Sequence, residues 1–416
     1  MTATRRWYSF WRGTTAAAAA AAFLLSATTA VATHHCATDD DCSLNGVCGK
    51  DGACVCDKPW GDVDCSKLQF LPAPISSCGD ACAYHAMDPR NTSWGGSVIR
   101  GADDGRYYMA AAEMHGGCGL NTWQTNSQVA IAVSDDGPLG PYTKQQVAVQ
   151  PWAHNPQIVR AATGEYLIFS LGNGTAHGRM KRCGGGTTRA GAQQPPAPPM
   201  RDFLATHTSA SAGTATVANK SVGFVIHYAA SLAGPWKAHT ATIPNFRGQD
   251  NMGNWNPAPV VLPDGTIRVM VHTDPAPWAG EVIVEARNGW RGPYERITGD
   301  VMSYCTRCQE DPFMWRDPRG RWHALLHKMF DPPGRSPIPS PGWSGGHIYS
   351  RDGLTWSHVQ RCYSTNVTLE GGGLLVTKRR ERPKLIFNEA GVPTHLTNGV
   401  ETAHGGTYTM IAPLAV

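Results

Sequence analysis

The sequence predicts an all-β protein: a five-bladed β-propeller preceded by a small disulfide-rich module. Two observations lead to this prediction. A unit of strand, Gly-containing turn and strand recurs five times between residues 96 and 399, and six cysteines crowd into residues 36–65 ahead of it. No helical periodicity of about 3.6 residues runs for long anywhere in the chain, which argues against a helical fold.

The first 32 residues have the pattern of a secretory signal peptide. Three arginines stand ahead of an Ala-rich apolar run, and the triplet AVA at 30–32 is a small-x-small cleavage site. The run is short for a membrane span, and no second segment is apolar and long enough to cross a bilayer. Removing this segment lowers the formal charge from +4 to +1, so nucleic-acid binding is not expected.

Secretion makes disulfide bonds, rather than zinc ligation, the expected state of the 13 cysteines. Four N-x-[ST] sequons fit the same compartment. They begin at Asn91, Asn173, Asn219 and Asn366. The chain is therefore predicted to be a secreted, extracellular glycoprotein.

The cysteine-rich stretch "CSLNGVCGKDGACVCDKPWGDVDC" (42–65) is too polar to form a core, so crosslinks must replace burial. Counted from Cys36, the fourth and fifth cysteines, Cys54 and Cys56, are separated by one residue, and Trp60-Gly61 precedes the sixth, Cys65. With these marks, residues 34–66 resemble an EGF-like domain. The resemblance implies the disulfides Cys36–Cys48, Cys42–Cys54 and Cys56–Cys65.

Calcium-binding EGF-like domains carry an acidic start ahead of the first cysteine, and only "THH" (33–35) stands here. The resemblance therefore implies no calcium in this module. Its spacing carries no catalytic group, so we expect a role in spacing or adhesion, with an extracellular protein as a possible partner.

The recurring unit defines the blades of a propeller over residues 70–416. Its five copies are residues 96–113, 156–172, 257–273, 311–327 and 382–399. A second strand–turn–strand unit lies between them, at 132–145, 227–239, 284–297 and 349–359. Two hairpins make a four-stranded blade. The fifth blade shows only its first hairpin, so it is expected to take its other strands from residues 66–95 and close the ring.

Residues 175–221 break this rhythm. They are rich in Gly, Ala, Pro and Thr, and are expected to form a long, partly disordered insertion in the second blade. Seven cysteines lie outside the EGF-like stretch: Cys78, Cys82, Cys118, Cys183, Cys305, Cys308 and Cys362. An odd number leaves one unpaired or bonded to another chain, and Cys183 is the expected one. Structural disulfides are favoured over zinc or a redox pair for Cys305-x-x-Cys308.

The residues just before each inner strand meet at one mouth of the propeller channel. They are "WGG" (94–96), "HN" (154–155), "WN" (255–256), "ED" (310–311) and "ER" (381–382). A convergent set of polar and aromatic side chains suits a carbohydrate pocket. The alternative is that these residues only tie the blade ends together.

Inner strands that open as acidic-x-Pro or x-Asn-Pro resemble those of glycoside hydrolase family 43 and its relatives over about residues 70–416. "RERPKLIF" (380–387) resembles the last-blade motif of the exo-galactanase-like branch. The resemblance implies inverting hydrolysis by an Asp base in the first blade, a tuning Asp in the third and a Glu acid in the fourth. In an inverting enzyme the acid and base lie about 6.5–9.5 Å apart.

Carried over position by position, the match to these three acids is partial. Glu310, in "QEDP", falls on the position of the general acid. "WGG" stands at the base position, and the nearest upstream carboxylate is Asp88, which fits the role if residues 90–95 are an insertion. Asn256 replaces the tuning Asp; it cannot ionise, but it can hydrogen-bond a sugar hydroxyl or the acid.

The predicted catalytic set is therefore Glu310, Asp311 and Asp88, with Asp311 orienting the acid or binding substrate. The predicted substrate contacts are His115, His154, Asn155, Trp255, Asn256, His327 and Arg382. His115 and His327 stand at strand ends, where a packed histidine is the more common case than a ligand for a sugar or a channel ion. No cofactor and no catalytic metal are expected.

The sequence is compatible with two functions. The first is a secreted glycoside hydrolase that acts on an extracellular polysaccharide or glycan, with Glu310 as the acid. The second is a non-catalytic propeller that binds glycan or protein beside an adhesion-type EGF-like module. The absent base at "WGG" and the replacement by Asn256 favour the second.

Overall fold

The computed structural model describes residues 35–85, 92–176, 178–183, 222–244, 256–273, 280–305, 309–328, 330–331, 338–339 and 343–416. The predicted signal peptide, Asp88, Trp255 and the sequons at Asn91 and Asn219 lie outside these residues. No helix within the described ranges has the length and apolar character needed to cross a bilayer.

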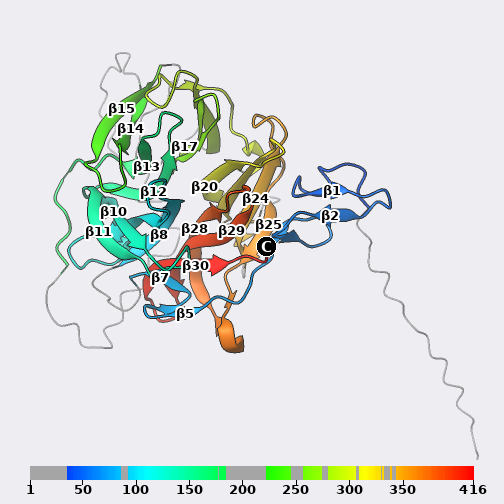
Figure 1. The fold of residues 1–416 in the computed structure, drawn as a ribbon, viewed down its shortest axis with the longest axis horizontal. Helices are drawn as coiled ribbons and strands as arrows, with labels where there is room; N and C mark the ends of the chain where they lie inside the picture. The colour runs from blue at the N-terminus through cyan, green and yellow to red at the C-terminus, as the bar shows by residue number, and fades with distance from the viewer. Residues whose placement is uncertain are drawn as a thin grey trace, which may run out of the picture. The chain divides into compact units, whose positions relative to one another are not determined.

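Five four-stranded antiparallel sheets form the blades of a propeller, arranged around a common centre (Figure 1). The first blade holds β8 (Ser93–Arg100), β9 (Tyr107–Met114), β10 (Ser127–Ser134) and β11 (Thr143–Val149). The second holds β12 (Ala153–Arg160), β13 (Tyr166–Gly172), β14 (Val222–Ala229) and β15 (Lys237–Ile243). The third holds β16 (Ala258–Val261), β17 (Ile267–Thr273), β18 (Gly280–Ala286) and β19 (Glu295–Arg296).

The fourth and fifth blades complete the ring. The fourth holds β20 (Gln309–Arg316), β21 (Trp322–Lys328), β24 (Trp343–Ser350) and β25 (Gln360–Ser364). The fifth holds β28 (Thr377–Phe387), β29 (Pro393–Thr402), β30 (Thr407–Pro413) and β7 (Cys82–Tyr84). The outer strand β7 comes from the N-terminal side and pairs Tyr84 with Thr409, which confirms that residues 66–95 help to close the ring and removes a free sheet edge. The prediction that both missing strands come from there is wrong, because β30 follows the first hairpin in sequence.

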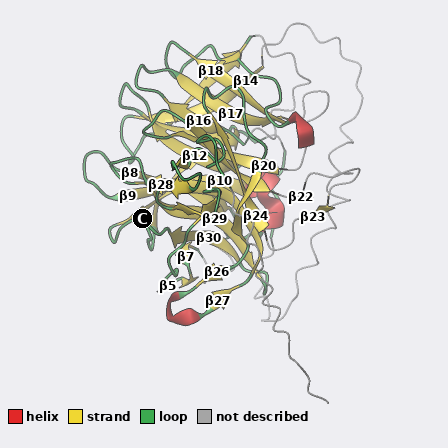
Figure 2. Ribbon diagram, turned by 90° about the vertical axis from the view of Figure 1, so that its right-hand side faces the viewer, coloured by secondary structure: helices red, strands yellow, loops and turns green. Residues whose placement is uncertain are grey.

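Short strands and a few short helices lie outside the five blades, with the helices at the rims of the propeller (Figure 2). The helices are η1 (Leu120–Thr122), α1 (Trp123–Asn126), η3 (Ser303–Cys305) and η4 (Glu370–Gly372). The small strands are β1 (Gly46–Cys48), β2 (Cys54–Cys56), β3 (Trp60–Gly61), β4 (Lys67–Leu68), β5 (Ile75–Ser76), β6 (Gly79–Asp80), β22 (Phe330–Asp331), β23 (Ile338–Pro339), β26 (Val367–Thr368) and β27 (Leu374–Leu375).

Packing between blades buries the apolar face of each alternating strand. Between the second and third blades, Phe169, Phe224 and Tyr294 pack ring against ring, with centroids 5.9 and 4.8 Å apart. Full burial of one such side chain contributes roughly 1.5–3 kcal/mol. The hairpin turns that connect these strands use glycine where φ is positive, as at Gly164 and Gly320 (φ 100° and 84°).

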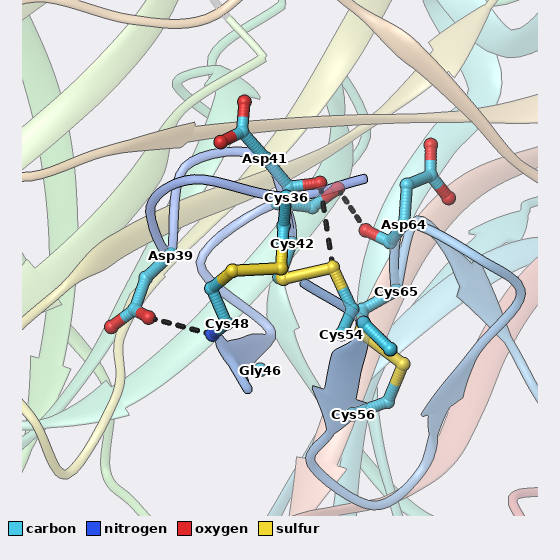
Figure 3. The surroundings of a disulfide bond; sticks show 12 residues. Cys36, Asp39, Asp41, Cys42, Gly46, Cys48, Cys54, Cys56, Asp64 and Cys65 are labelled. Atoms are coloured by element: carbon cyan, nitrogen blue, oxygen red, sulfur yellow. Dashed lines mark hydrogen bonds between the residues drawn. A yellow bond between two sulfur atoms is a disulfide. The ribbon is translucent and has the colours of Figure 1, made fainter. Parts of the chain in front are cut away.

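The N-terminal disulfide-rich module (residues 35–66) contains the disulfides Cys36–Cys48, Cys42–Cys54 and Cys56–Cys65 (Figure 3). This is the pairing that the EGF-like resemblance implies. The Asp39 carboxylate also accepts a hydrogen bond from the backbone N–H of Cys48 at 2.9 Å. Crosslinks and turns therefore hold a segment that has little core of its own.

The remaining cysteines correct one prediction. Cys183, expected to be unpaired, forms a disulfide with Cys118, and Cys78 pairs with Cys82. Among the described residues, Cys362 is instead a free thiol, and burial raises its pKa to about 12. Cys118 and Cys183 are 65 residues apart in the sequence, so the spacing of the cysteines could not predict that they pair. Cys308, and with it the predicted role of Cys305-x-x-Cys308, lies outside the described residues.

Residues 178–183 belong to the predicted insertion, and they are tied to the first blade. Besides the disulfide, the buried Asn126 side chain donates to the Lys181 carbonyl at 2.9 Å and accepts from the Lys181 N–H at 3.0 Å. The predicted disorder of residues 184–221 lies outside the described residues.

Candidate functional site: the channel mouth

One residue near the start of each inner strand has a positive φ. These residues are Gly95, Asn155, Asn256, Asp311 and Arg382, with φ of 73°, 45°, 33°, 59° and 58°. In four of the five blades the strand pairing shifts at this point, as in a β-bulge. Each residue except the glycine precedes a proline, which cannot donate to a strand ladder. A bulge re-aims the side chain at its position, so one backbone device turns four side chains toward one point.

These four side chains form a hydrogen-bonded ring, named here the central ring. Asn155 Nδ2 donates to Asn256 Oδ1 at 3.1 Å and to Asp311 Oδ1 at 3.3 Å. The Arg382 guanidinium donates to Asn256 Oδ1 at 3.0 Å and also to Asp311 Oδ1. Lys384 Nζ donates to Asn155 Oδ1 at 2.8 Å. The ring thus couples four blades through buried polar contacts.

Gly95 fills the first-blade position of the ring. A Cβ atom added there would lie 2.8 Å from the Arg382 Cβ, so the Arg382 side chain occupies the space of a first-blade side chain. Neighbouring Trp94 is buried, with the Arg379 guanidinium 4.8 Å from its ring. "WGG" therefore supplies no carboxylate to the mouth.

A second group of charges surrounds His327, at the end of β21, and is named here the His327 cluster. His327 Nδ1 lies 3.5 Å from Glu310 Oε1 and 4.0 Å from Asp311 Oδ2, and its Nε2 lies 3.9 Å from Glu381 Oε1. Arg379 holds Glu381 through two hydrogen bonds, of 2.6 and 2.9 Å. Three carboxylates therefore share one imidazole and two guanidinium groups.

Exposure separates the three carboxylates. The side chain of Glu310 is 25% exposed, whereas those of Asp311 and Glu381 are 0% and 5% exposed. Glu310 is thus the carboxylate of this cluster that a ligand can reach, while the other two are engaged by arginines.

Burial and neighbouring charges shift the pKa values of the His327 cluster in opposite directions. Burial raises the pKa of Asp311 to about 7, against the attraction of Arg382. Burial also acts to raise the pKa of Glu310, but His327 and Arg382 outweigh it and lower that pKa to about 2. Burial lowers the pKa of His327, yet the carboxylates, led by Glu381, raise it above its usual value. At neutral pH the cluster therefore favours an ionised Glu310 beside a proton held on His327.

Several buried polar atoms at the mouth have no hydrogen-bond partner among the described residues, although two of them belong to the charge pairs of the His327 cluster. They are Asp311 Oδ2, His327 Nδ1, Arg382 Nε and His154 Nε2. A buried polar atom without a partner costs about 1–3 kcal/mol, so such atoms call for water or a polar ligand. Convergence of donors and acceptors suits a hydroxyl-rich molecule.

Six of the predicted site residues come together: Asn155, Asn256, Glu310, Asp311, His327 and Arg382. His154 is close but buried, with Nδ1 2.7 Å from Ser127 Oγ and its ring 5.1 Å from that of Trp123. His115 is exposed just after β9, and its backbone N–H donates to the Asn126 backbone carbonyl. The predicted residues Asp88 and Trp255 lie outside the described residues.

The sequence did not indicate Arg379 and Lys384 as members of the site, and it placed Glu381 at the mouth without a role. All three belong to the charged run "KRRERPK" (378–384) of β28. So many charges are unusual on an inner propeller strand, because such strands are buried. The charged run itself was therefore the feature of the sequence that could have indicated these three residues.

Glu310, Asp311, His327 and Glu381 also place one potential ligand atom each within 4.8 Å of one another. Carboxylate oxygens with one imidazole suit a divalent cation. Arg379 and Arg382 already balance two of the carboxylates, so the charge of the cluster does not require a metal ion.

No protein-family model matches the chain, and no curated protein matches it. Among solved structures, it is similar to Zg3597, a family 117 glycoside hydrolase of Zobellia galactanivorans, at 14% identity over 84% of this chain and 90% of that one, with a TM-score of 0.48. A Dyadobacter fermentans protein of unknown function aligns at 12% identity over 84% and 97%, with a TM-score of 0.47.

CoXyl43, a family 43 β-xylosidase/α-arabinofuranosidase from a compost metagenome, aligns at 10% identity over 80% of this chain and 94% of that one, with a TM-score of 0.46. Glycoside hydrolases thus recur among the structures that this chain resembles.

Proposed function

We propose that the protein is a secreted glycoside hydrolase that cleaves an extracellular polysaccharide or glycan, with Glu310 as the proton donor. One observation carries the proposal. Glu310 is the exposed carboxylate of the His327 cluster, and it lies 3.5 Å from an imidazole whose pKa is raised. Glycosidic cleavage needs a carboxylic acid that can reach the leaving oxygen and obtain a proton.

The proton reaches Glu310 from His327 in this proposal. Without substrate Glu310 is ionised, since its pKa is lowered. A sugar over the mouth excludes water, and desolvation disfavours the carboxylate form. The proton held near His327 Nδ1 then moves to Glu310 and on to the leaving oxygen, while Glu381 and Asp311 stabilise the charge state of the imidazole. His327 is thus a positioning and proton-storing residue, and Glu310 is the acid.

Activation of the attacking water is assigned to Asp88. Gly95 and Asn256 leave the first and third blades without a carboxylate in the central ring, so the base must come from elsewhere on the mouth. An inverting reaction requires it about 6.5–9.5 Å from Glu310. Arg382 Nε and His154 Nε2 are proposed to contact substrate oxygens, together with Asn155. His115 and Trp255 remain proposed substrate contacts from the sequence.

The extracellular assignment rests on the five disulfides and the sequons. Asn366 is exposed and Asn173 is partly exposed, so both are accessible to glycosylation. The disulfide-rich module is proposed to space the propeller or to bind an extracellular protein.

A non-catalytic glycan-binding propeller is the second candidate. Gly95 and Asn256 favour it, because they stand where a hydrolase of this type would place two acids. Unpaired donors and acceptors at the mouth bind sugar hydroxyls whether or not a bond is cleaved.

Activity and binding measured together separate the two candidates. The wild-type protein is incubated with β-galactan, arabinan and xylan, and released sugar and polysaccharide binding are both measured. Glu310→Gln is expected to lose about 10²–10⁴-fold in activity while it still binds. Glu370→Gln, at an exposed glutamate of η4, is the control and should behave as wild type.

Unchanged activity in Glu310→Gln would rule out Glu310 as the acid. Binding without release of sugar from any polysaccharide would favour the non-catalytic candidate. Full activity in Asp88→Asn would remove Asp88 as the base and leave the acid assignment intact.

A further inference from the structure

We propose a second ligand site at the end of the channel opposite the mouth, which binds a small aromatic carboxylate that also carries a hydroxyl group. The mouth is built from the first residues of the inner strands. This site is built from later residues of the inner strands of all five blades and from the hairpin turns of the third, fourth and fifth blades. No residue of the central ring or of the His327 cluster lines it.

The site is a cavity of about 800 Å³. Its walls are mainly apolar, and include Ile99, Val159, Val261, Phe313, Trp315 and Phe387. Volumes of roughly 300–1,000 Å³ with apolar walls and a few polar groups are typical of small-molecule sites. Size and lining therefore fit a compact ligand rather than a polymer chain.

Aromatic rings form one wall of the cavity. The ring centroid of Phe313 lies 6.0 Å from that of Trp315 and 6.3 Å from that of Phe387, with interplanar angles of 30° and 21°. Trp315 already stacks on Trp60 and His323, so the partly buried Phe387 offers the ring face on which an aromatic ligand stacks, at a gain of about 0.5–1.5 kcal/mol beyond burial. This wall favours a planar body for the ligand.

Gln157 supplies a polar atom deep in the cavity. Its side chain is 2% exposed, and Nε2 donates to the Pro259 carbonyl at 3.5 Å. Its Oε1 has no protein partner among the described residues. A ligand hydroxyl that donates to Oε1 would satisfy an atom that is otherwise costly to bury.

Two arginines stand at the cavity rim, Arg160 at the end of β12 and Arg316 at the end of β20. Each donates Nε to the glycine carbonyl of its own hairpin, Gly164 at 3.2 Å and Gly320 at 3.0 Å. Neither has an ion pair with a carboxylate of the described residues. Held by the turn, each guanidinium keeps its terminal nitrogens for an anion.

Arg100, at the same position in the first blade, shows what such an arginine binds. Its Nε donates to the Gly105 carbonyl at 3.1 Å in the same way, and its terminal NH1 donates to the Glu389 carboxylate at 2.7 Å. By analogy within the molecule, the partner expected at Arg160 and Arg316 is a carboxylate that the ligand brings.

The spacing of these groups sets the length of the ligand. Gln157 and Arg160 are three residues apart on β12, so their Cα atoms lie roughly 10 Å apart and their side chains leave opposite faces of the strand. A phenyl ring with a para hydroxyl and a short alkyl carboxylate spans such a distance. The hydroxyl would reach Gln157, the ring would stack on the aromatic wall and the carboxylate would meet the arginines.

Calorimetric titration with 3-(4-hydroxyphenyl)propionate tests the proposal. Two probes each lack one group: 3-phenylpropionate has no hydroxyl, and 3-(4-hydroxyphenyl)propionamide has no carboxylate. Loss of either group is expected to weaken binding about tenfold. Failure of the first probe to bind at millimolar concentration, or equal binding of the acid and the amide, would overturn the proposal.

Variants link the binding to these residues. The double variant Arg160→Gln/Arg316→Gln should weaken binding of the acid about tenfold and leave binding of the amide unchanged. Arg100→Gln, whose partner is Glu389, is the matched control and should bind as wild type. Gln157→Leu should bind the hydroxylated acid no better than 3-phenylpropionate. Wild-type affinity in the double variant, which alters only exposed side chains and should stay folded, would contradict the site.

Discussion

Charged side chains gather in two regions of this molecule, the channel mouth and the interface between the disulfide-rich module and the propeller. At the mouth, Arg382 and Asp311 are 9% and 0% exposed. At the module interface, Arg351 and Asp40 are 59% and 45% exposed, although they too are joined by hydrogen bonds, of 2.6 and 2.9 Å. Similar contacts thus lie in very different surroundings.

The difference in exposure determines how much each ion pair contributes to stability. A buried pair has lost its hydration, so removing one partner strands the other as an uncompensated charge. Removing one partner of an exposed pair only returns the other to water. At the module interface the energy comes instead from Trp60, whose ring lies 6.4 Å from that of Trp315 and 4.7 Å from that of His347.

The largest effect is expected for Arg382→Ala. The substitution leaves the Asp311 carboxylate buried without a cation, which should lower the free energy of unfolding by about 3–5 kcal/mol at pH 8. Urea unfolding measures it. The loss should shrink at lower pH, because burial already raises the pKa of Asp311 and a protonated carboxyl needs no counter-charge.

The double variant Arg382→Ala/Asp311→Asn provides the control for this comparison. Measured against Asp311→Asn alone, loss of Arg382 should then be much less destabilising, since no charge is stranded. An equal loss in both backgrounds would show that Arg382 stabilises the ring by packing rather than by charge.

Trp60→Ala is expected to be the next largest change, at about 3 kcal/mol. Its side chain is 7% exposed and joins the module to the propeller, so the loss should appear as separation of the module. Limited proteolysis near residues 66–69 should become faster, while Trp60→Phe and Val55→Ala (59% exposed in the wild type) should remain resistant. Unchanged proteolysis in Trp60→Ala would assign the interface to its ion pairs.

Protonation of His327 should make a smaller contribution that depends on pH. Its pKa is raised by Glu381, Glu310 and Asp311, so the stabilisation is fully present below the unfolded value of about 6.5 and is lost as pH rises through the folded pKa. The stability of the wild type relative to His327→Gln should therefore decrease from pH 6 to 9.

His395 offers a control of opposite sign. Burial lowers its pKa to about 4, so the unfolded state binds the extra proton between pH 4 and about 6.5. The stability of the wild type relative to His395→Gln should increase over that interval. Parallel slopes for the two histidines would contradict the charge assignment of the His327 cluster.

The propeller could be predicted because its signal is local and repeated. Alternating strands with a glycine at each turn, such as Gly164 and Gly320, identify hairpins without any long-range information. Counting them showed only one hairpin in the fifth blade; β7 supplies one of the two remaining strands, as predicted, whereas β30 was not predicted. Local patterns of this kind do not predict the Cys118–Cys183 disulfide, because only the folded chain brings the two residues together.

The mouth could be predicted only in part. Repetition places Asn155, Asn256, Asp311 and Arg382 at equivalent positions, and the proline after each indicates an interrupted ladder. Whether these side chains meet depends on a positive φ at each of them, which intrinsic preference makes uncommon for residues other than glycine. Tertiary contacts impose that conformation, so the hydrogen-bonded ring was not visible in the sequence.

The smallest effect is expected for Arg351→Ala, which removes the exposed pair with Asp40. Such pairs contribute about 0–1 kcal/mol, and high salt should abolish what remains. Arg321→Ala is the informative comparison. Arg321 is 14% exposed, and it donates to the Leu44 and Gly46 carbonyls at 3.0 and 3.1 Å as well as to Asp39. Its loss leaves acceptors unpaired and should cost more at every salt concentration in urea unfolding. If the two arginines prove equal, exposure does not determine the strength of these contacts, and the contrast between the mouth and the module interface fails.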